Sequence, residues 1–177
     1  AMMANFRTYT VVGGMPEVVQ RFLDTQGDLA SVRQLQSELN EQYRRDISKY
    51  ASGRALQVQS IYDQLPIMLE GEHKRFVLNS IDPKAHYEKY QRDFVWLADA
   101  GVALKADIVT EPKSPLLKTA RPSQFKLYQS DTGMLMVRYP VGVAQAAYLD
   151  SKEPNLGGIY ENVVAQQLAT QNRQLYY

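Results

Sequence analysis

Cysteine is absent from the 177 residues, so neither a disulfide scaffold nor a thiolate nucleophile is available to this chain. Histidine occurs only as His73 and His86, and no second ligand stands at zinc-binding spacing from either. The sequence contains no run of about 18 apolar residues, so we predict that no segment of it contacts a membrane by spanning it. Together these absences favour a cytoplasmic setting.

The sequence also lacks a phosphate-binding loop of the form G-x-x-x-x-G-K-[ST] and the G-x-S-x-G turn of serine hydrolases. Its 20 lysines and arginines stand against 19 aspartates and glutamates, so overall charge gives no argument for a nucleic-acid partner. With 45% hydrophobic and 22% charged residues, the composition is that of a folded domain. No complete set of catalytic residues can be identified, and we predict that the chain itself is not an enzyme.

Residues 1–53 are predicted to form a helical hairpin. A short helix begins near Pro16, where the missing N–H costs nothing, and ends around Gly27. Asp28 is placed to cap the next helix, in which apolar residues recur at helical spacing for roughly five or six turns. Ser52 and Gly53 are expected to end it.

Residues 54–130 show three helical segments followed by two strands, the order of a winged helix-turn-helix. The first helix is predicted to be kinked or interrupted at Pro66, and a short helix is predicted around 76–81. Asp82 and Pro83 are the expected start of the third helix. The predicted unit is completed by a helix end at Gly101, a strand over 102–108, a proline-containing loop over 111–122 and a returning strand over 125–128.

Residues 131–177 are predicted to contain a helix around 143–150, a turn-rich connector over 151–158, a helix over 159–168 and a strand over 175–177. That strand has no partner after it in the sequence. We therefore expect the chain to be an excised piece of a longer protein. The predicted fold class is mainly α with a small β-hairpin, followed by the start of an α/β unit.

Several segments resemble one known family. They are Gly13-Gly14-Met15-Pro16-Glu17, Trp96-Leu97-Ala98-Asp99-Ala100-Gly101, Phe125-Lys126-Leu127-Tyr128 with Asp131-Thr132-Gly133, and Gly158-Ile159-Tyr160-Glu161-Asn162. The chain resembles the region that follows the ATP-hydrolysing core in uncharacterised prokaryotic AAA-type, archaeal-ATPase-like proteins. The resemblance implies lid helices, a winged helix and the start of a PD-(D/E)xK-like nuclease domain. It also implies ATP and Mg²⁺ as cofactors of the parent protein, although none is expected in this chain.

The resemblance places Gly13, Gly14 and Pro16 on the lid side of the parent's nucleotide site. Glycines permit close backbone approach, and a helix N-terminus offers free N–H groups to an anion. An ordinary loop-to-helix turn is the alternative. Glu161 resembles the first-helix carboxylate of the nuclease fold, but one carboxylate cannot hold Mg²⁺ in nuclease geometry. We therefore favour a capping or surface glutamate and predict no metal site.

Lys113, Lys118 and Arg121 lie in the expected wing and are the candidate nucleic-acid contacts. The third helix argues against DNA, because its exposed side carries charges of both signs: Lys84, Lys89 and Arg92 against Glu88, Asp93 and Asp99. We predict a non-catalytic regulatory or interaction module that couples nucleotide state to a partner, either the remainder of its own ATPase chain or another protein. The alternative is a DNA-binding winged-helix module of the same ATPase. A contiguous positive face would favour DNA, and an apolar, tyrosine-rich patch would favour protein docking.

Overall fold

The computed structural model describes residues 2–51, 53–151, 155–171 and 173–177, which form a mainly helical fold with one small sheet. The helices are α1 (Met2–Val12), α2 (Pro16–Asp24), α3 (Leu29–Tyr50), α4 (Ala55–Glu70), α5 (Tyr87–Asp99), α6 (Thr132–Met136), α7 (Val141–Leu149) and α8 (Gly157–Ala169). The other elements are the 3₁₀ turns η1 (Leu78–Ser80) and η2 (Leu116–Lys118) and the strands β1 (Ala103–Val109), β2 (Ala120–Gln129) and β3 (Leu175–Tyr176). Ser52, at the predicted end of α3, and 152–154, in the predicted connector, lie outside the described residues.

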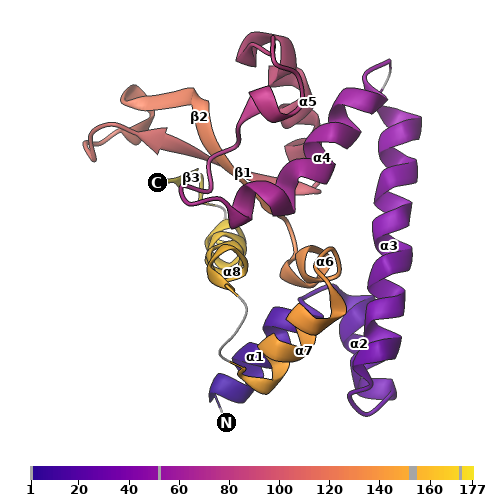
Figure 1. Ribbon diagram of the computed structural model, residues 1–177. Coiled ribbons are helices and arrows are strands. Elements are labelled where there is room, and N and C mark those ends of the chain that lie inside the picture. Colours follow the sequence, from indigo (N-terminus) through magenta and orange to yellow (C-terminus); the bar gives the residue numbers. More distant parts are fainter. Residues whose placement is uncertain (1, 52, 152–154, 172) are drawn as a thin grey trace.

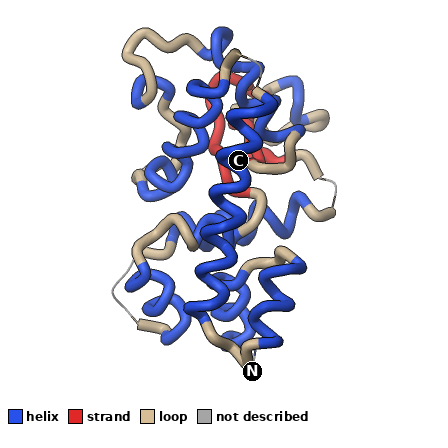
Figure 2. Tube along the Cα trace, turned by 90° about the vertical axis from the view of Figure 1, so that its right-hand side faces the viewer, coloured by secondary structure: helices blue, strands red, loops and turns tan. Residues whose placement is uncertain are grey.

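The sheet has the strand order β2–β1–β3, in which β1 and β2 are antiparallel and β1 and β3 are parallel. The strand predicted at 175–177 is therefore partnered, by a strand that precedes it in the sequence. Figure 1 shows α4 and α5 near the sheet, α8 below it, and α3 running along one side of the molecule. Figure 2 shows the strands together in one half, whereas the half around the N terminus is built from helices. At this level the predicted fold class, mainly α with a β-hairpin, is confirmed.

The largest core cluster packs α4 and α5 against the sheet. Phe94 of α5 meets Phe125 of β2 edge-on with ring centroids 4.7 Å apart, and Phe76 stacks on Phe125 at 5.9 Å. Leu97 and Leu127 are buried in this cluster, whereas Trp96 is only partly buried. The cluster draws on residues from all three predicted domain ranges, 1–53, 54–130 and 131–177, whose boundaries stay predictions.

Three residues that were predicted to start or end a helix have the expected hydrogen bond or backbone conformation. The Asp28 side chain accepts a hydrogen bond from the Ala30 N–H at 3.0 Å, as the cap of α3 should. Gly27 and Gly101 have φ of +92° and +68°, so each adopts the left-handed conformation that glycine tolerates after a helix. These predictions are confirmed.

A kink or an interruption was predicted at Pro66, and the interruption is wrong, because α4 continues through it from Ala55 to Glu70. A proline inside a helix leaves the carbonyl four residues earlier without its usual N–H donor. That carbonyl belongs to Tyr62, and the buried Arg138 guanidinium donates to it at 2.6 Å. The distant arginine therefore replaces the hydrogen bond that the proline removes.

Three other boundaries also differ from the predictions. Helix α5 begins at Tyr87 rather than after Asp82, whose carboxylate instead accepts from the Lys84 N–H at 2.9 Å in a preceding turn. The short helix expected around 76–81 is only the turn η1. Strand β2 begins at Ala120, so the predicted loop ends earlier. Helix α1, before the first predicted helix, was not foreseen, because its apolar residues form no one-sided stripe.

Candidate functional site

The Gly13–Gly14 turn, which joins α1 to α2, is attached to a buried carboxylate far along the chain. Asp131 is only 4% exposed, and its Oδ2 accepts from the Gly14 N–H at 2.7 Å. Its Oδ1 caps α6 by accepting from the Met134 N–H at 3.1 Å. The Gln166 side chain of α8 donates to Oδ2 at 3.1 Å. One carboxylate thus joins the turn, α6 and α8.

Two glycines are required by the close approach of this turn to α6. Gly13 has φ of +79°, and a Cβ there would lie 2.3 Å from Asp131 Oδ1. A Cβ on Gly133 would lie 2.3 Å from the Val12 carbonyl oxygen. Gly14 is exposed, and a Cβ there would meet its neighbours only at ordinary contact distances from 3.6 Å. The backbone approach predicted for Gly13 is therefore made to Asp131 and Gly133 of the same chain.

Pro16 is exposed at the first turn of α2, as predicted, and the helix has no side-chain cap at Met15. The first turn also carries Glu17, a negative charge. The structure brings Gly13, Gly14 and Pro16 together on one turn. Their role beside a nucleotide stays a prediction.

The inner face of α8 binds the backbone of the segment between β2 and α6. The Asn162 amide accepts from the Gln129 N–H at 2.7 Å and donates to the Gln129 carbonyl at 3.0 Å. One turn later, Gln166 accepts from the Thr132 N–H at 2.9 Å. Both amide side chains are buried, and together they hold α8 in register with the end of β2.

The outer face of α8 is apolar and exposed. Tyr160, Val164 and Leu168, spaced by one helical turn each, are 41%, 58% and 38% exposed. They border a cleft of about 390 Å³ between α8, β2 and β3. We call it the α8–β3 cleft; its other lining residues are Ala106, Lys126, Tyr128, Gly157, Glu161, Ala165, Leu175, Tyr176 and Tyr177.

Glu161 lies within this cleft and is ion-paired, not free. Its Oε2 accepts from Lys126 Nζ at 2.9 Å and from the Tyr128 hydroxyl at 3.2 Å, while Lys74 Nζ lies 3.4 Å from Oε1. Burial alone would raise the pKa of Glu161, but the Lys126 hydrogen bond and the two ammonium charges outweigh it and lower the pKa. Burial and the Glu161 charge raise the pKa of Tyr128, which keeps its phenol protonated as a donor. Glu161 is therefore a partner of two lysines rather than a helix cap.

The wing candidates are exposed but do not share one element. Lys113 lies in the β1–β2 loop and pairs with Glu111 at 2.7 Å. Lys118 ends η2, and Arg121 lies within β2, so the prediction that all three sit in a loop is wrong for Arg121. The strand extends there because Val109 and Ile108 of β1 pair with Ala120 and Arg121 beyond the register shift.

The charge balance predicted for the third helix needs two corrections. Asp93 is 2% exposed and is held by the Arg54 fork, so it contributes nothing to the exposed face. Lys84 lies outside α5, in the turn before it. The exposed charges that remain on α5 are Glu88, Lys89, Arg92 and Asp99, still two of each sign.

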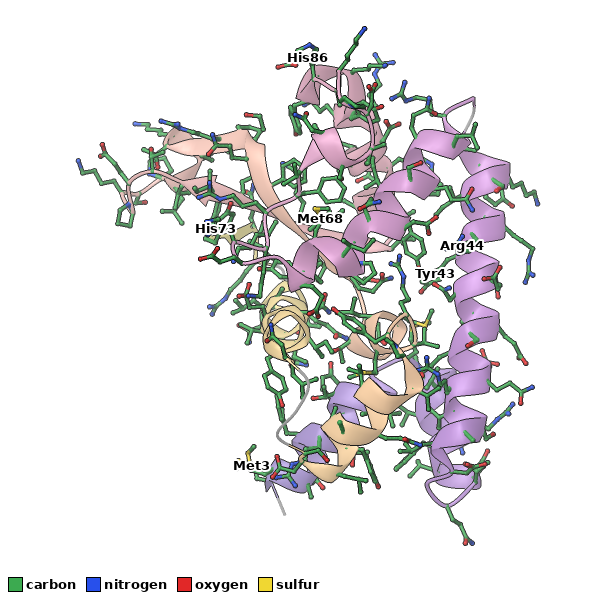
Figure 3. The ribbon with its side chains drawn as sticks, viewed as in Figure 1. Met3, Tyr43, Arg44, Met68, His73 and His86 are labelled. Carbon is green, nitrogen blue, oxygen red and sulfur yellow. The ribbon has the colours of Figure 1, made fainter. Side chains whose placement is uncertain are left out.

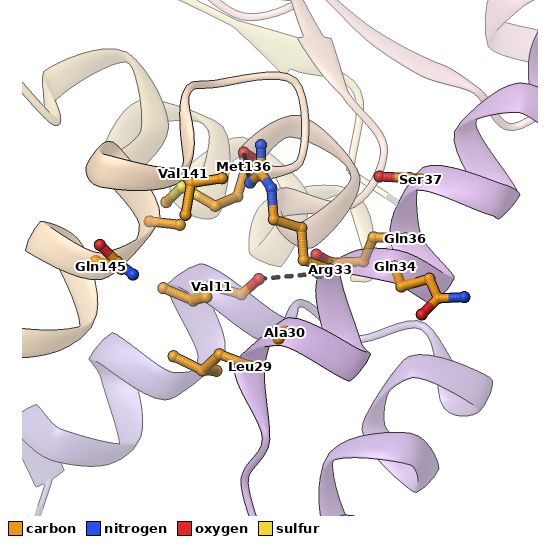
Figure 4. A pocket seen from close by; sticks show the side chains of 11 residues that line it. Val11, Leu29, Ala30, Arg33, Gln34, Gln36, Ser37, Met136, Val141 and Gln145 are labelled. Carbon is orange, nitrogen blue, oxygen red and sulfur yellow. Dashed lines mark hydrogen bonds between the residues drawn. The ribbon is translucent and has the colours of Figure 1, made fainter.

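A second cleft of about 390 Å³ lies between α1, α3, α6 and α7 (Figure 4). Its principal charged side chain, Arg33, is already used: its guanidinium donates to the carbonyls of Val137 at 3.0 Å and of Tyr139. Gln36 donates to the Val11 and Val12 carbonyls at 2.9 and 3.1 Å. These polar groups therefore bind carbonyls at the C-terminal ends of α6 and α1, and an apolar hollow is left between the two helices.

Within the described ranges, no three carboxylate or histidine side chains gather as a metal site would require. His73 follows α4 and His86 precedes α5, and Figure 3 shows them in separate parts of the fold. None of the described helices combines the length and the apolar character needed to cross a bilayer.

Sequence reasoning did not identify Asp131 or Gln166 as site residues. In Asp131-Thr132-Gly133, an aspartate suited to cap a helix is followed by a glycine two positions later. Sequence reasoning used this run only as part of the family resemblance and did not predict the cap. The contact with Gly14 spans 117 residues and leaves no mark in local sequence.

In comparison with known families, residues 3–142 match a domain of unknown function (DUF8612). No curated protein and no solved structure matches the chain. Because the match covers more than half of the sequence, including the Gly13–Gly14 turn, Asp131 and the strands β1 and β2, this chain belongs to the DUF8612 family.

Proposed function

We propose that this chain is a non-catalytic interaction module of an AAA-type ATPase, in which α8 and β3 contact a partner polypeptide. The observation that carries the proposal is the α8–β3 cleft. An exposed stripe of Tyr160, Val164 and Leu168 beside three further tyrosines is the kind of surface that proteins use for docking. Tyrosine suits such a surface, because its ring is apolar and its hydroxyl can hydrogen bond.

The proposed module also couples the nucleotide state of the ATPase to the partner, and this coupling would run through the two faces of α8. Its outer face lines the cleft, and its inner face reaches Asp131 through Gln166. Asp131 in turn holds Gly14, on the turn that resembles the lid side of a nucleotide site. A change at that turn therefore has a continuous hydrogen-bonded route to the docking helix.

The fold assignments of the proposal follow the element order. The order α4, η1, α5, β1 and β2 supports a winged helix, and α8 followed by β3 supports the start of a PD-(D/E)xK-like unit. ATP and Mg²⁺ belong to the parent protein in this proposal, and a cytoplasmic location follows from its class.

DNA binding is the alternative, and the wing offers little for it. Lys113 is paired with Glu111, which leaves Lys118 and Arg121 as exposed cations, and α5 presents charges of both signs. Two neutralised phosphates imply a slope near −2 in log affinity against log salt. Fluorescence anisotropy with labelled duplexes should therefore show weak binding that is indifferent to sequence. Sub-micromolar, sequence-selective binding at about 150 mM salt would promote DNA to first place.

Site-specific photo-crosslinking separates the two functions. A photoreactive residue is placed at Tyr160 in the cleft, at Lys118 in the wing, and at Leu56 as a control on the exposed side of α4, 78% exposed. We expect polypeptide cross-links from position 160 in the native host and none from position 56. Nucleic-acid cross-links from position 118, without polypeptide cross-links from position 160, would refute the proposal.

A further inference from the structure

The second cleft, between α1, α3, α6 and α7, has apolar walls and is kept open by small side chains (Figure 4). Val11 and Val141 belong to its walls, and Ala30 and Ala144 stand where larger side chains would fill the space. Its volume of about 390 Å³ lies within the range of small-molecule sites. We call it the Arg33 cleft, after the charged side chain that lines it.

The positive charge in the Arg33 cleft has no full negative charge beside it. Arg33 is the sole charged residue among the described residues that line the cleft. The carbonyls of Val137 and Tyr139 accept from its guanidinium, but carbonyls supply only partial negative charge. Burial lowers the pKa of Arg33, and no neighbouring charge of the described residues opposes that shift. Because a guanidinium stays protonated even so, the cleft favours an anion.

A second donor lies on the same face of α3. Ser37 follows Arg33 by one helical turn, and both residues line the cleft. The Ser37 hydroxyl has no hydrogen-bond partner among the described residues. A single guanidinium matches a carboxylate, which carries one negative charge, better than a phosphate monoester, which carries nearly two.

We propose that the Arg33 cleft binds a small amphipathic monocarboxylate with an apolar chain, of the kind found in short fatty acids. The carboxylate lies beside the Arg33 guanidinium and the Ser37 hydroxyl, and the apolar chain lies against Val11 and Val141. This site is separate from the α8–β3 cleft, and the inference does not depend on the proposed function.

Isothermal titration of the whole chain with octanoate tests the inference. Octanol and octylamine, of the same chain length, serve as the uncharged and the positively charged analogue. We expect saturable binding of octanoate, binding of octanol that is weaker by about tenfold or more, and none of octylamine. Methyl NMR locates the ligand: signals of Val11, Leu29 and Val141 should shift, whereas those of Val164 and Leu168, exposed on α8, should not.

Two variants separate the charge from the cavity. Arg33→Met should lower the affinity for octanoate to that for octanol and leave octanol unchanged. The matched control Arg45→Met, exposed on the same helix, should change neither. Arg33→Met also removes the donor to the α6 carbonyls, so its folding is checked by thermal melting.

Ala30→Leu provides the independent test, because it narrows the cleft from an exposed helical position and leaves the Arg33 hydrogen bonds in place. It should weaken both octanoate and octanol by about tenfold or more, since the added side chain takes the space of the ligand. Ala98→Leu, exposed on α5, should change neither.

Equal affinity for octanoate and octanol would overturn the inference, as would methyl shifts confined to α8 or the absence of binding. Octanoate binding that Ala30→Leu leaves unchanged would place the ligand elsewhere and reject the site. Tighter binding of octyl phosphate than of octanoate would reject the monocarboxylate.

Discussion

Asp131→Asn tests the junction between the Gly13–Gly14 turn, α6 and α8. The substitution preserves shape but leaves one acceptor oxygen where the carboxylate has two. Oδ2 receives the Gly14 N–H and the Gln166 amide, and Oδ1 receives the Met134 N–H. An NH₂ group at the Oδ1 position would face the Met134 N–H. At the Oδ2 position it would face the Gly14 N–H and the Gln166 amide, which cannot turn its oxygen toward it because that oxygen accepts from the Thr132 N–H.

The loss is at least one hydrogen bond to a charged acceptor, worth about 1.5–3 kcal/mol, together with about 1 kcal/mol for a donor left unsatisfied. We therefore expect the free energy of unfolding to fall by about 2.5–4 kcal/mol. For a chain of this size each kcal/mol lowers Tm by about 2–4 °C, so a loss near 3 kcal/mol lowers Tm by about 6–12 °C.

Urea denaturation followed by circular dichroism measures this change. The matched control is Asp28→Asn, which also replaces a helix-capping aspartate but lies on the exposed side of α3. Asparagine caps as well as aspartate, so the control should change stability by less than about 0.5 kcal/mol. If Asp131→Asn also stayed within about 0.5 kcal/mol of the wild type, the network would not have the importance that its geometry implies.

Three further predictions test separate parts of the fold. Gly13→Ala should destabilise by more than about 2 kcal/mol, because of its positive φ and the clash with the network, whereas Gly14→Ala should cost less than about 1 kcal/mol by the same urea assay. Equal losses would contradict that geometry. Arg138→Met should lower stability by about 2–4 kcal/mol in thermal melts, because it leaves the buried Tyr62 carbonyl without a donor; a neutral result would mean that water replaces the guanidinium. Because the folded-state pKa of Glu161 is lowered, its contribution is present above the ordinary value of 4.5 and is lost as pH falls through the folded pKa. The stability difference between wild type and Glu161→Gln should therefore shrink as pH falls below 4.5 and through the lower folded-state pKa, and a difference that grew in acid would reverse the assignment.

The parts of the fold that were predicted correctly are those specified by nearby residues. Asp28 caps α3 through a bond to a residue two positions on, and Gly27 and Gly101 end helices by their own backbone conformation. Phe125 and Leu127, two positions apart in the returning strand, share one face of it and lie in the core. Such signals need no knowledge of the tertiary structure.

The wrong predictions concern residues whose conformation depends on partners that are distant in the sequence. Pro66 is tolerated inside α4 only because Arg138, 76 residues from Tyr62, supplies the missing donor. Sequence reasoning about a proline considers the helix alone and therefore predicts a kink or a break, of which the break is wrong. Arg121 was assigned to a loop because prolines surround it, yet pairing with β1 extends the strand through it. In both cases a tertiary partner overrides a local preference.

The candidate site was predictable in parts but not as a site. Glu161 was recognised as a carboxylate near the start of a helix, and the Gly13–Gly14 turn as a place of close backbone approach. The partners of each were not visible: Lys126 meets Glu161 across 35 residues, and Asp131 meets Gly14 across 117. The apolar stripe on α8 resembles a core face in sequence, and only the structure leaves it exposed.

The hydrogen bonds around Asp131 also indicate where this fold would yield first. Helix α8 makes four hydrogen bonds to the stretch from Gln129 at the end of β2 to Thr132 at the start of α6, two through Asn162 and two through Gln166. The turn is joined to Asp131 by a single hydrogen bond from Gly14. A displacement of the turn would therefore break the Gly14 contact before it separated α8 from β2. The α8–β3 cleft should keep its shape in such a step, and the change that reaches α8 would be the loss of one of the two donors to Asp131 Oδ2, the other being Gln166.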